Sequence, residues 1–181
     1  MTVSLLDERT ALIVIDLQAG IASAPQAAPV IARAVELADA FRAHGQPVVL
    51  VNVTGGAPGR TERPRPAASR PAGWDELLPE LGDGIRVTKK TWGAFHGTDL
   101  DATLRELGVT QVVLAGIATS KGVESTARAA HEHGYNVTVA VDAVADMDPE
   151  AHRNSIERVF PALGETGSAA QIIELLAATA R

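Results

Sequence analysis

Asp16 is the residue whose position in the sequence most strongly indicates chemistry. It ends the apolar run ALIVID, residues 11–16, and a carboxylate at the end of a buried strand needs a partner or a catalytic role. Capping of a following helix is the structural alternative, because Asp is a favoured N-cap residue. Lys89 and Lys90 end a weaker apolar run, and an ammonium group beside the carboxyl would hold it ionised or tune it as an acid or base.

Two aromatic residues, Trp92 and Phe95, follow these lysines closely. The chain has only two Trp, three Phe and one Tyr, so the pair is a candidate for a substrate site beside the lysines. The alternative is that both rings belong to the core and that both lysines are surface charges.

A second stretch, GIATSKGVEST at residues 116–126, leaves an apolar run and enters a helical pattern. Such a junction fixes side-chain direction and offers free backbone N–H groups to an anion. Gly122 stands at the turn and has no side chain that could react. Ser120 and Thr119 are the nearby hydroxyls; capping or stabilising the loop is their simpler role, since an unactivated serine is a weak nucleophile.

The strands and helices that must position these residues are predicted by two alternating sequence patterns, apolar runs and helical periodicity. Apolar, β-branched runs predict buried parallel strands at residues 11–16, 47–53, 84–89, 112–117 and 137–143, with a short last strand or turn in LGETGS. Helical periodicity lies between and after them, at residues 28–45, 98–108, 121–134, 149–164 and 168–180. This order predicts an open parallel sheet with helices on both faces, in which ligands bind at the carboxyl ends of the strands.

Composition limits the class of partner. The length of 181 residues predicts one domain, residues 1–181, and a net charge of −6 argues against nucleic acid or an anionic membrane as the main partner. A small-molecule ligand fits better. The absence of cysteine excludes disulfides, thiolate metal sites and a catalytic thiol. The N-terminus lacks the pattern of a secretory signal, so we expect a soluble, cytoplasmic protein.

Residues 54–76 form a connection that is rich in Gly and Pro and too long for an ordinary loop. At the carboxyl end of a strand it is a candidate lid or binding wall. Its four arginines could receive a carboxylate, because a guanidinium fork matches that geometry; they are Arg60, Arg63, Arg65 and Arg70. Solvated charge or a contact between subunits is the alternative.

Three blocks in this order resemble the isochorismatase-like (cysteine hydrolase) superfamily: LIVIDLQ, KKTWGAFHGTDLDATLRELGV and VVLAGIATSKGVESTARAAHEHGYNVTVAVDAVAD. The likeness runs from about residue 9 to 146. This superfamily includes nicotinamidases, carbamoylsarcosine and ureidoacrylate amidohydrolases, and isochorismatases. The resemblance implies a three-layer α/β/α Rossmann-like fold with a six-stranded parallel sheet, a small-molecule substrate, and assembly as a homodimer or homotetramer.

The resemblance also implies roles for individual residues. Asp16 and Lys89 take the catalytic Asp and Lys positions, with Lys90 as a neighbour, and Gly122 takes the position of the nucleophilic cysteine. A non-prolyl cis peptide falls at Ile117–Ala118. The expected substrate-binding residues are Gln18, Trp92, Phe95, Ile117 and Ala118. The metal-binding Asp-x-His pair of the nicotinamidases is missing from VNVTGGAP, so we expect neither a metal nor another cofactor. His96 is the only histidine expected near the site, and we interpret it as a surface residue.

Glycine at position 122 changes the expected chemistry, because it cannot attack a carbonyl. True isochorismatases resemble this chain in having glycine there, and they hydrolyse a vinyl ether. Asp16 would protonate the enol-ether carbon and Lys89 would position the substrate, without a covalent intermediate. Isochorismatases carry a tyrosine where this chain has Ala118, so substrate identity does not transfer. The alternative is a catalytically inactive family member that binds a small molecule or acts through assembly; retention of both Asp16 and Lys89 argues against it.

Overall fold

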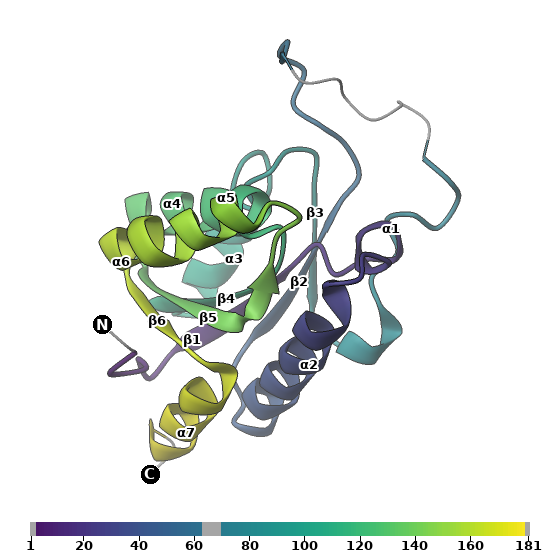
Figure 1. Cartoon of the computed structure of the whole chain (residues 1–181). Coiled ribbons are helices and arrows are strands. Elements are labelled where there is room, and N and C mark those ends of the chain that lie inside the picture. The colour runs from purple at the N-terminus through teal and green to yellow at the C-terminus, as the bar shows by residue number, and fades with distance from the viewer. Residues whose placement is uncertain (1–2, 63–69, 180–181) are drawn as a thin grey trace.

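A parallel sheet forms the centre of the fold, which is described from a computed structural model that covers residues 3–62 and 70–179. Its six strands are all parallel and lie in the order β3-β2-β1-β4-β5-β6 (Figure 1). They are β1 (Thr10–Ile15), β2 (Val48–Val53), β3 (Ile85–Lys89), β4 (Gln111–Ile117), β5 (Asn136–Ala145) and β6 (Glu165–Gly167). Every residue of β1 and β4 is buried, as a continuous apolar run predicts for a central parallel strand.

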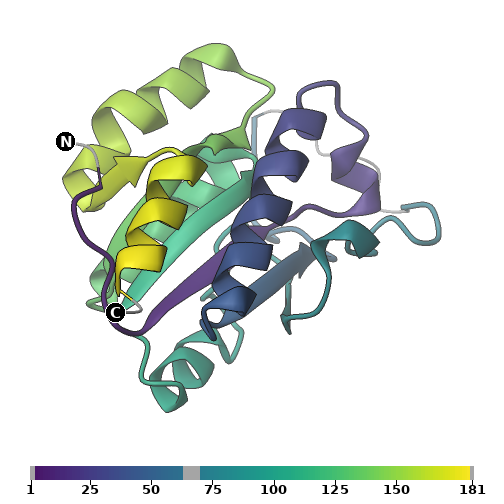
Figure 2. The same cartoon turned by 90° about the horizontal axis from the view of Figure 1, so that it is seen from below.

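Helices cover both faces of this sheet. They are α1 (Ala19–Ala22), α2 (Ala27–Ala43), α3 (Leu100–Glu106), α4 (Glu124–Glu132), α5 (Pro149–Asn154), α6 (Phe160–Leu163) and α7 (Ala169–Thr179). Figure 2 shows α2 and α7 side by side across one face, and α3, α4 and α6 pack on the other. The predicted three-layer α/β/α fold with six parallel strands is therefore confirmed.

The core consists of two apolar layers separated by the sheet. Side chains along β1 alternate between them: Leu12 and Val14 pack toward α2 and α7, whereas Ile13 and Ile15 pack toward α3 and α4. This alternation matters at the carboxyl ends of the strands, because it decides which polar side chains meet on the same face.

Two predicted helices contain a wider turn than an α-helix has. The helix expected over 121–134 begins with a π-helical turn, η2 (Thr119–Val123), and the one expected over 149–164 is interrupted by η3 (Ser155–Val159). Pro161 follows η3 and lacks the N–H that an α-helical turn would require, which explains this interruption. A single 3₁₀ turn, η1 (Pro79–Leu81), precedes β3. Within residues 3–62 and 70–179, no helix combines the length and apolar character needed to cross a membrane.

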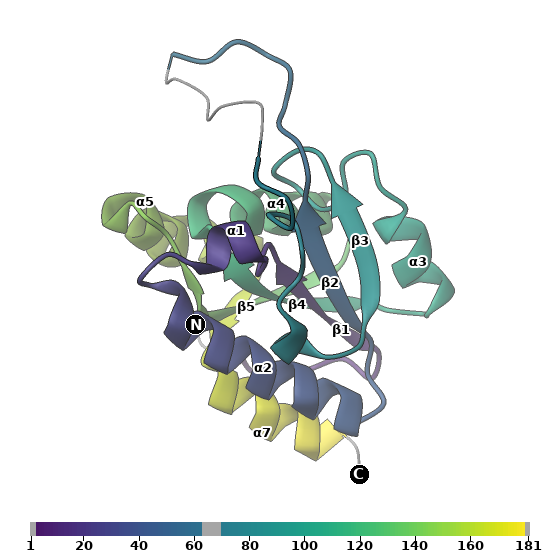
Figure 3. The same cartoon turned by 90° about the vertical axis from the view of Figure 1, so that its right-hand side faces the viewer.

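The connection after β2 extends away from the carboxyl edge of the sheet in its first described part, residues 54–62 (Figures 1 and 3). After residue 70 the described chain runs along the N-terminal end of α1. Ala19 N–H donates to the Glu76 carbonyl and Gly20 N–H to the Trp74 carbonyl. The returning segment therefore lies against the residues that directly follow Asp16.

Candidate active site

A buried ion pair joins the carboxyl ends of β1 and β3. Lys89 Nζ donates to Asp16 Oδ2 over 2.8 Å and to the Thr91 carbonyl over 3.1 Å. The two side chains are 1% and 7% exposed, for Lys89 and Asp16 respectively. Val87 and Lys89 alternate onto the buried face of β3, whereas Lys90 is exposed. The structure therefore pairs Lys89, rather than Lys90, with Asp16.

The environment of Asp16 favours its protonated form. Burial raises the pKa of the Asp16 carboxyl to about 6, although the charge and hydrogen bond of Lys89, and the charge of Arg70, act in the opposite direction. Its second oxygen, Oδ1, is buried and has no hydrogen-bond partner in the described part of the chain. Asp16 also has a positive φ of 56°, an uncommon conformation for a residue other than glycine. A protonated carboxyl in this site would hold its proton on Oδ1, a buried oxygen without a hydrogen-bond partner among the described residues.

Gly122 lies directly beside this carboxyl. A Cβ atom built on Gly122 would stand 3.0 Å from Ile15 Cγ2, 3.2 Å from Asp16 Oδ2 and 3.5 Å from the Trp92 carbonyl oxygen. Its own carbonyl accepts a hydrogen bond from Thr126 Oγ1, which in turn accepts one from the Ala94 N–H. The wide η2 turn thus places backbone, rather than a side chain, next to Asp16.

The peptide bond between Ile117 and Ala118 is cis, as the resemblance implied. It joins the end of β4 to η2, and the Ala118 carbonyl accepts hydrogen bonds from the N–H groups of Lys121 and Val123. Ile117 is buried and Ala118 is partly exposed. Both residues therefore lie on the strand-to-helix junction that carries Gly122, and their contact with a substrate stays a prediction.

The other predicted binding residues lie in different surroundings. Gln18 is fully buried, and its side-chain amide is occupied: Nε2 donates to the carbonyls of Val53 and Trp74, and Oε1 accepts from the Val53 N–H. The amide thereby links Val53, at the end of β2, to Trp74 in the segment before η1. Trp92 is 60% exposed at the surface.

Phe95 packs in the core at the end of α4 that is remote from Gly122. Its ring centroid is 5.2 Å from that of His133, the residue that caps the carboxyl end of α4, and 5.9 Å from that of Tyr135. The structure brings together Asp16, Lys89 and Gly122 and leaves the Phe95 ring outside this group. His96 is exposed.

The hydroxyls near Gly122 are both engaged. Ser120 donates from its backbone N–H (2.8 Å) and its Oγ (2.7 Å) to Asp146 Oδ2, and Thr119 Oγ1 lies 2.9 Å from His152 Nδ1. Burial alone would raise the pKa of Asp146, but the hydrogen bonds from Ser120 and from the Asp148 N–H, together with the charge of Lys121, outweigh it and lower that pKa. Sequence reasoning missed Asp146 and His152. Their signal was that Asp146 directly follows β5 and so belongs to the same carboxyl edge as Asp16.

Of the two arginines of the connection that the structure describes, Arg60 and Arg70, it is Arg70 whose charge acts on Asp16. Arg70 Nη2 donates to the Gly55 carbonyl over 3.2 Å, and its guanidinium lies 3.7 Å above the Trp74 ring. Arg60 is exposed. Arg63 and Arg65 lie outside the described residues.

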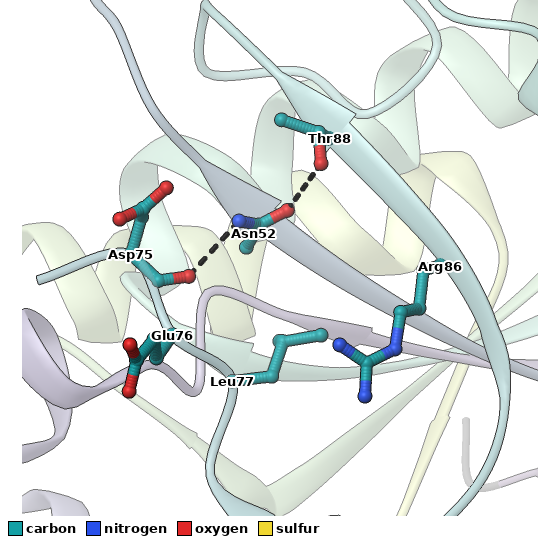
Figure 4. Close-up of a pocket in the computed structure, with 6 residues that line it drawn as sticks. All are labelled: Asn52, Asp75, Glu76, Leu77, Arg86 and Thr88. Carbon is teal, nitrogen blue, oxygen red and sulfur yellow. Dashed lines mark hydrogen bonds between the residues drawn. The ribbon is translucent and has the colours of Figure 1, made fainter. Parts of the chain in front are cut away.

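Figure 4 shows a separate hollow of about 200 Å³. Arg86 and Thr88 line it, and because they alternate with the buried Val87 and Lys89 along β3, they point to the opposite face of the sheet from Lys89. The hollow is lined by Asn52, Asp75, Glu76, Leu77, Arg86 and Thr88. Thr88 donates to Asn52 Oδ1 and Asn52 Nδ2 donates to the Asp75 carbonyl, so the Asn52 side chain is held by hydrogen bonds at both ends. We place the candidate active site at Asp16 because the carboxyl with the raised pKa and the oxygen without a hydrogen-bond partner lie there. Among residues 3–62 and 70–179, no three His, Asp or Glu side chains are grouped as a metal site would require.

Comparisons with known proteins agree with the geometry. The sequence model of the isochorismatase domain matches residues 10–171. The chain is 43% identical over 180 residues to the uncharacterized isochorismatase family protein YecD of Escherichia coli O157:H7, covering 92% of this chain and 96% of that one. It is 34% identical over 178 residues to the ureidoacrylate amidohydrolase RutB of Stutzerimonas stutzeri (strain A1501), covering 78% and 71%.

A solved structure of an isochorismatase family protein from Burkholderia thailandensis superposes with a TM-score of 0.92 at 40% identity, covering 96% of this chain and 98% of that one. The match therefore extends through the whole sheet and the elements that carry Asp16, Lys89 and Gly122. This chain belongs to the isochorismatase family of hydrolases.

Proposed function

We propose that this protein hydrolyses a small, carboxylated vinyl ether by acid catalysis, with Asp16 as the proton donor. The observation that carries the proposal is the state of the Asp16 carboxyl: it is buried, its pKa is raised to about 6, and its Oδ1 has no hydrogen-bond partner in the described part of the chain. A general acid needs a pKa near the working pH and a proton on an oxygen that the substrate can reach.

The reaction balances with water as the only co-reactant. In a substrate of the form CH2=C(OR)COO⁻, the π electrons of the double bond take the Asp16 proton to form a C–H bond at the terminal carbon, which leaves an oxocarbenium ion. Water adds to this cation and returns a proton to the Asp16 carboxylate. The resulting hemiketal breaks its C–OR bond while the hydroxyl proton passes to the leaving oxygen. The products are pyruvate and the alcohol ROH.

Lys89 has two roles in this account. Its ammonium fixes Asp16 Oδ2 by a hydrogen bond of 2.8 Å, so that Oδ1, which is buried in this structure, is the oxygen left to carry the transferable proton. Its charge also opposes the effect of burial and keeps the Asp16 pKa from rising further. A carboxyl with a pKa of about 6 is protonated in about a tenth of the molecules at neutral pH and can be reprotonated in each cycle.

In this reaction Gly122 contributes only its backbone beside Asp16 and no reacting side chain. The missing side chain leaves space next to Asp16 Oδ2, where a Cβ atom would stand at 3.2 Å. A covalent route has no thiol to use, because the chain contains no cysteine. Ser120 is an unsuitable substitute, since the carboxylate that its hydroxyl donates to, Asp146, has a lowered pKa and is therefore a weak base. A mechanism through an oxocarbenium ion requires neither a cysteine thiol nor a serine nucleophile.

The test is a turnover assay with 2-(cyclohexyloxy)acrylate, a simple carboxylated enol ether, and with ureidoacrylate as the competing amide. We expect pyruvate from the enol ether and a loss of about 100-fold or more in kcat/KM for Asp16→Asn, the usual contribution of a general acid. Asp83→Asn, at an exposed carboxylate, is the matched control and should leave the rate unchanged. Turnover of ureidoacrylate alone, or silence toward the whole panel, would contradict the proposal; silence would favour a ligand-binding protein.

A further inference from the structure

Arg70 is held in place between the two segments that carry the catalytic pair. Its guanidinium stacks 3.7 Å above the Trp74 ring, and its Nη2 donates to the Gly55 carbonyl. Stacking on an aromatic face and a backbone hydrogen bond together restrain a side chain that would otherwise be free to rotate. The charge of Arg70 is therefore fixed in position although the residue is exposed.

Trp74 and Gly55, the two residues that hold Arg70, both pack against segments next to the proposed catalytic pair. The Trp74 ring lies directly on Gly20, where a Cβ atom would come within 2.0 Å of it, and Gly20 is four residues beyond Asp16. Gly55 lies against Lys90, since a Cβ atom built on Gly55 would stand 3.1 Å from Lys90 Cβ, and Lys90 follows Lys89. The guanidinium thus bridges the backbone after Asp16 and the backbone after Lys89.

No carboxylate neutralises this charge. Every Asp and Glu of the chain lies within the described residues, and none of them forms an ion pair with Arg70. Of its guanidinium donors, only Nη2 has a hydrogen bond within residues 3–62 and 70–179. Other arginines with acidic neighbours do pair, as Arg33 does with Glu36 and Arg105 with Asp101. Arg70 keeps planar donors available for an anion from outside the chain.

We propose that Arg70 binds the carboxylate of the substrate and so selects anionic over neutral substrates. This inference rests on the proposed function, since it places the substrate's carboxylate beside the group that Asp16 protonates. A guanidinium fork can take both oxygens of a carboxylate at once, which also fixes the orientation of the enol ether relative to Asp16.

Binding would also affect the acid itself. The charge of Arg70 acts to lower the pKa of Asp16. A bound carboxylate neutralises that charge, and the loss of its lowering effect on the pKa favours the protonated form of Asp16. The substrate would therefore promote protonation of the residue that must give it a proton, whereas a neutral analogue would not.

The experiment measures binding separately from turnover. The probe is 2-(cyclohexyloxy)propanoate, which lacks the double bond and cannot be hydrolysed by carbon protonation, and it is compared with the neutral 2-(cyclohexyloxy)propanamide. Calorimetric titration of the wild type and of Arg70→Gln should show a loss of about 10-fold to 100-fold in affinity for the propanoate, as expected for a charged hydrogen bond. The propanamide should bind both proteins equally, and Arg70→Lys should recover part of the propanoate affinity.

Arg86→Gln is the matched control, because it removes the same charge from an exposed position on the opposite face of β3. It should bind the propanoate like the wild type. Equal binding of the propanoate by wild type and Arg70→Gln, an equal loss for the propanamide, or no binding of the propanoate by the wild type would overturn the inference. If the propanoate binds through Arg70 while 2-(cyclohexyloxy)acrylate is not hydrolysed, the anion site stands and the proposed reaction fails.

Discussion

Replacing Asp16 with Asn should stabilise the protein at neutral pH, against the usual effect of removing half of a buried ion pair. Asn has the shape of a protonated Asp and does not titrate. The comparison between Asp16→Asn and the wild type therefore isolates the free energy of ionising this one carboxyl inside the fold.

The magnitude follows from the two pKa values. The Asp16 carboxyl titrates at about 6 in the folded protein, against 3.8 as its ordinary value. Because the folded pKa is the higher one, the favourable contribution is complete below about pH 4 and is lost as the pH rises through about 6. A difference of about two units corresponds to about 3 kcal/mol. The advantage of Asp16→Asn should thus be close to zero near pH 4 and about 3 kcal/mol at neutral pH.

Urea unfolding at a series of pH values measures this difference, with the unfolding free energy taken by linear extrapolation. The other titrating groups are common to both proteins and cancel when the two curves are subtracted. Asp83→Asn, at an exposed carboxylate, should show no such pH-dependent gain. Parallel curves for the wild type and Asp16→Asn across this range would refute the reasoning, and so would a variant that becomes less stable as the pH rises.

Three further predictions concern catalysis. Above about pH 6, kcat/KM for 2-(cyclohexyloxy)acrylate should fall about tenfold per pH unit, because the acid form of Asp16 is lost; a flat profile would assign the proton to another group. Lys89→Met should move this falling limb to higher pH, since the Lys89 charge lowers the Asp16 pKa, and an unmoved limb would contradict the pairing. Gly122→Ala should lower kcat/KM by about tenfold or more, since its methyl group would meet Ile15 Cγ2 at 3.0 Å and Asp16 Oδ2 at 3.2 Å. Gly56→Ala, which meets nothing within 4 Å, should keep full activity; equal rates for both variants would show that space beside Asp16 is unimportant.

Much of the fold could be predicted from the sequence because the signals are local and continuous. The apolar runs of β1 and β4 are long enough to be buried on both faces, and they form within two residues of their expected bounds. The π-helical turns were not predicted. The η2 turn directly follows β4, and its Gly122 lies close to the Trp92 carbonyl in the loop after β3. Helical periodicity in the sequence carries no information about such contacts between segments.

For a similar reason, the catalytic residues of the candidate site could be predicted from the sequence, whereas contacts between its distant segments could not. Asp16 could be found because an acidic residue interrupts an apolar pattern. The residues alone left Lys89 and Lys90 open, and the family resemblance chose Lys89, which the structure places on the buried face of β3. No periodic pattern in the sequence predicts the stacking of Arg70 on Trp74. The same is true of the contact between Thr119 and His152, which lie in different segments of the chain. Only the folded chain shows these pairs.

The most direct test of acid catalysis is hydrolysis of 2-(cyclohexyloxy)acrylate in D2O, with the deuterium content of the pyruvate methyl group measured by mass spectrometry during the first minutes. Protonation of the enol-ether carbon predicts pyruvate with one solvent deuterium in its methyl group, formed by the wild type and by Asp83→Asn and lost with Asp16→Asn. Undiminished formation of this product by Asp16→Asn, or an absence of pyruvate from the wild type, would contradict the account.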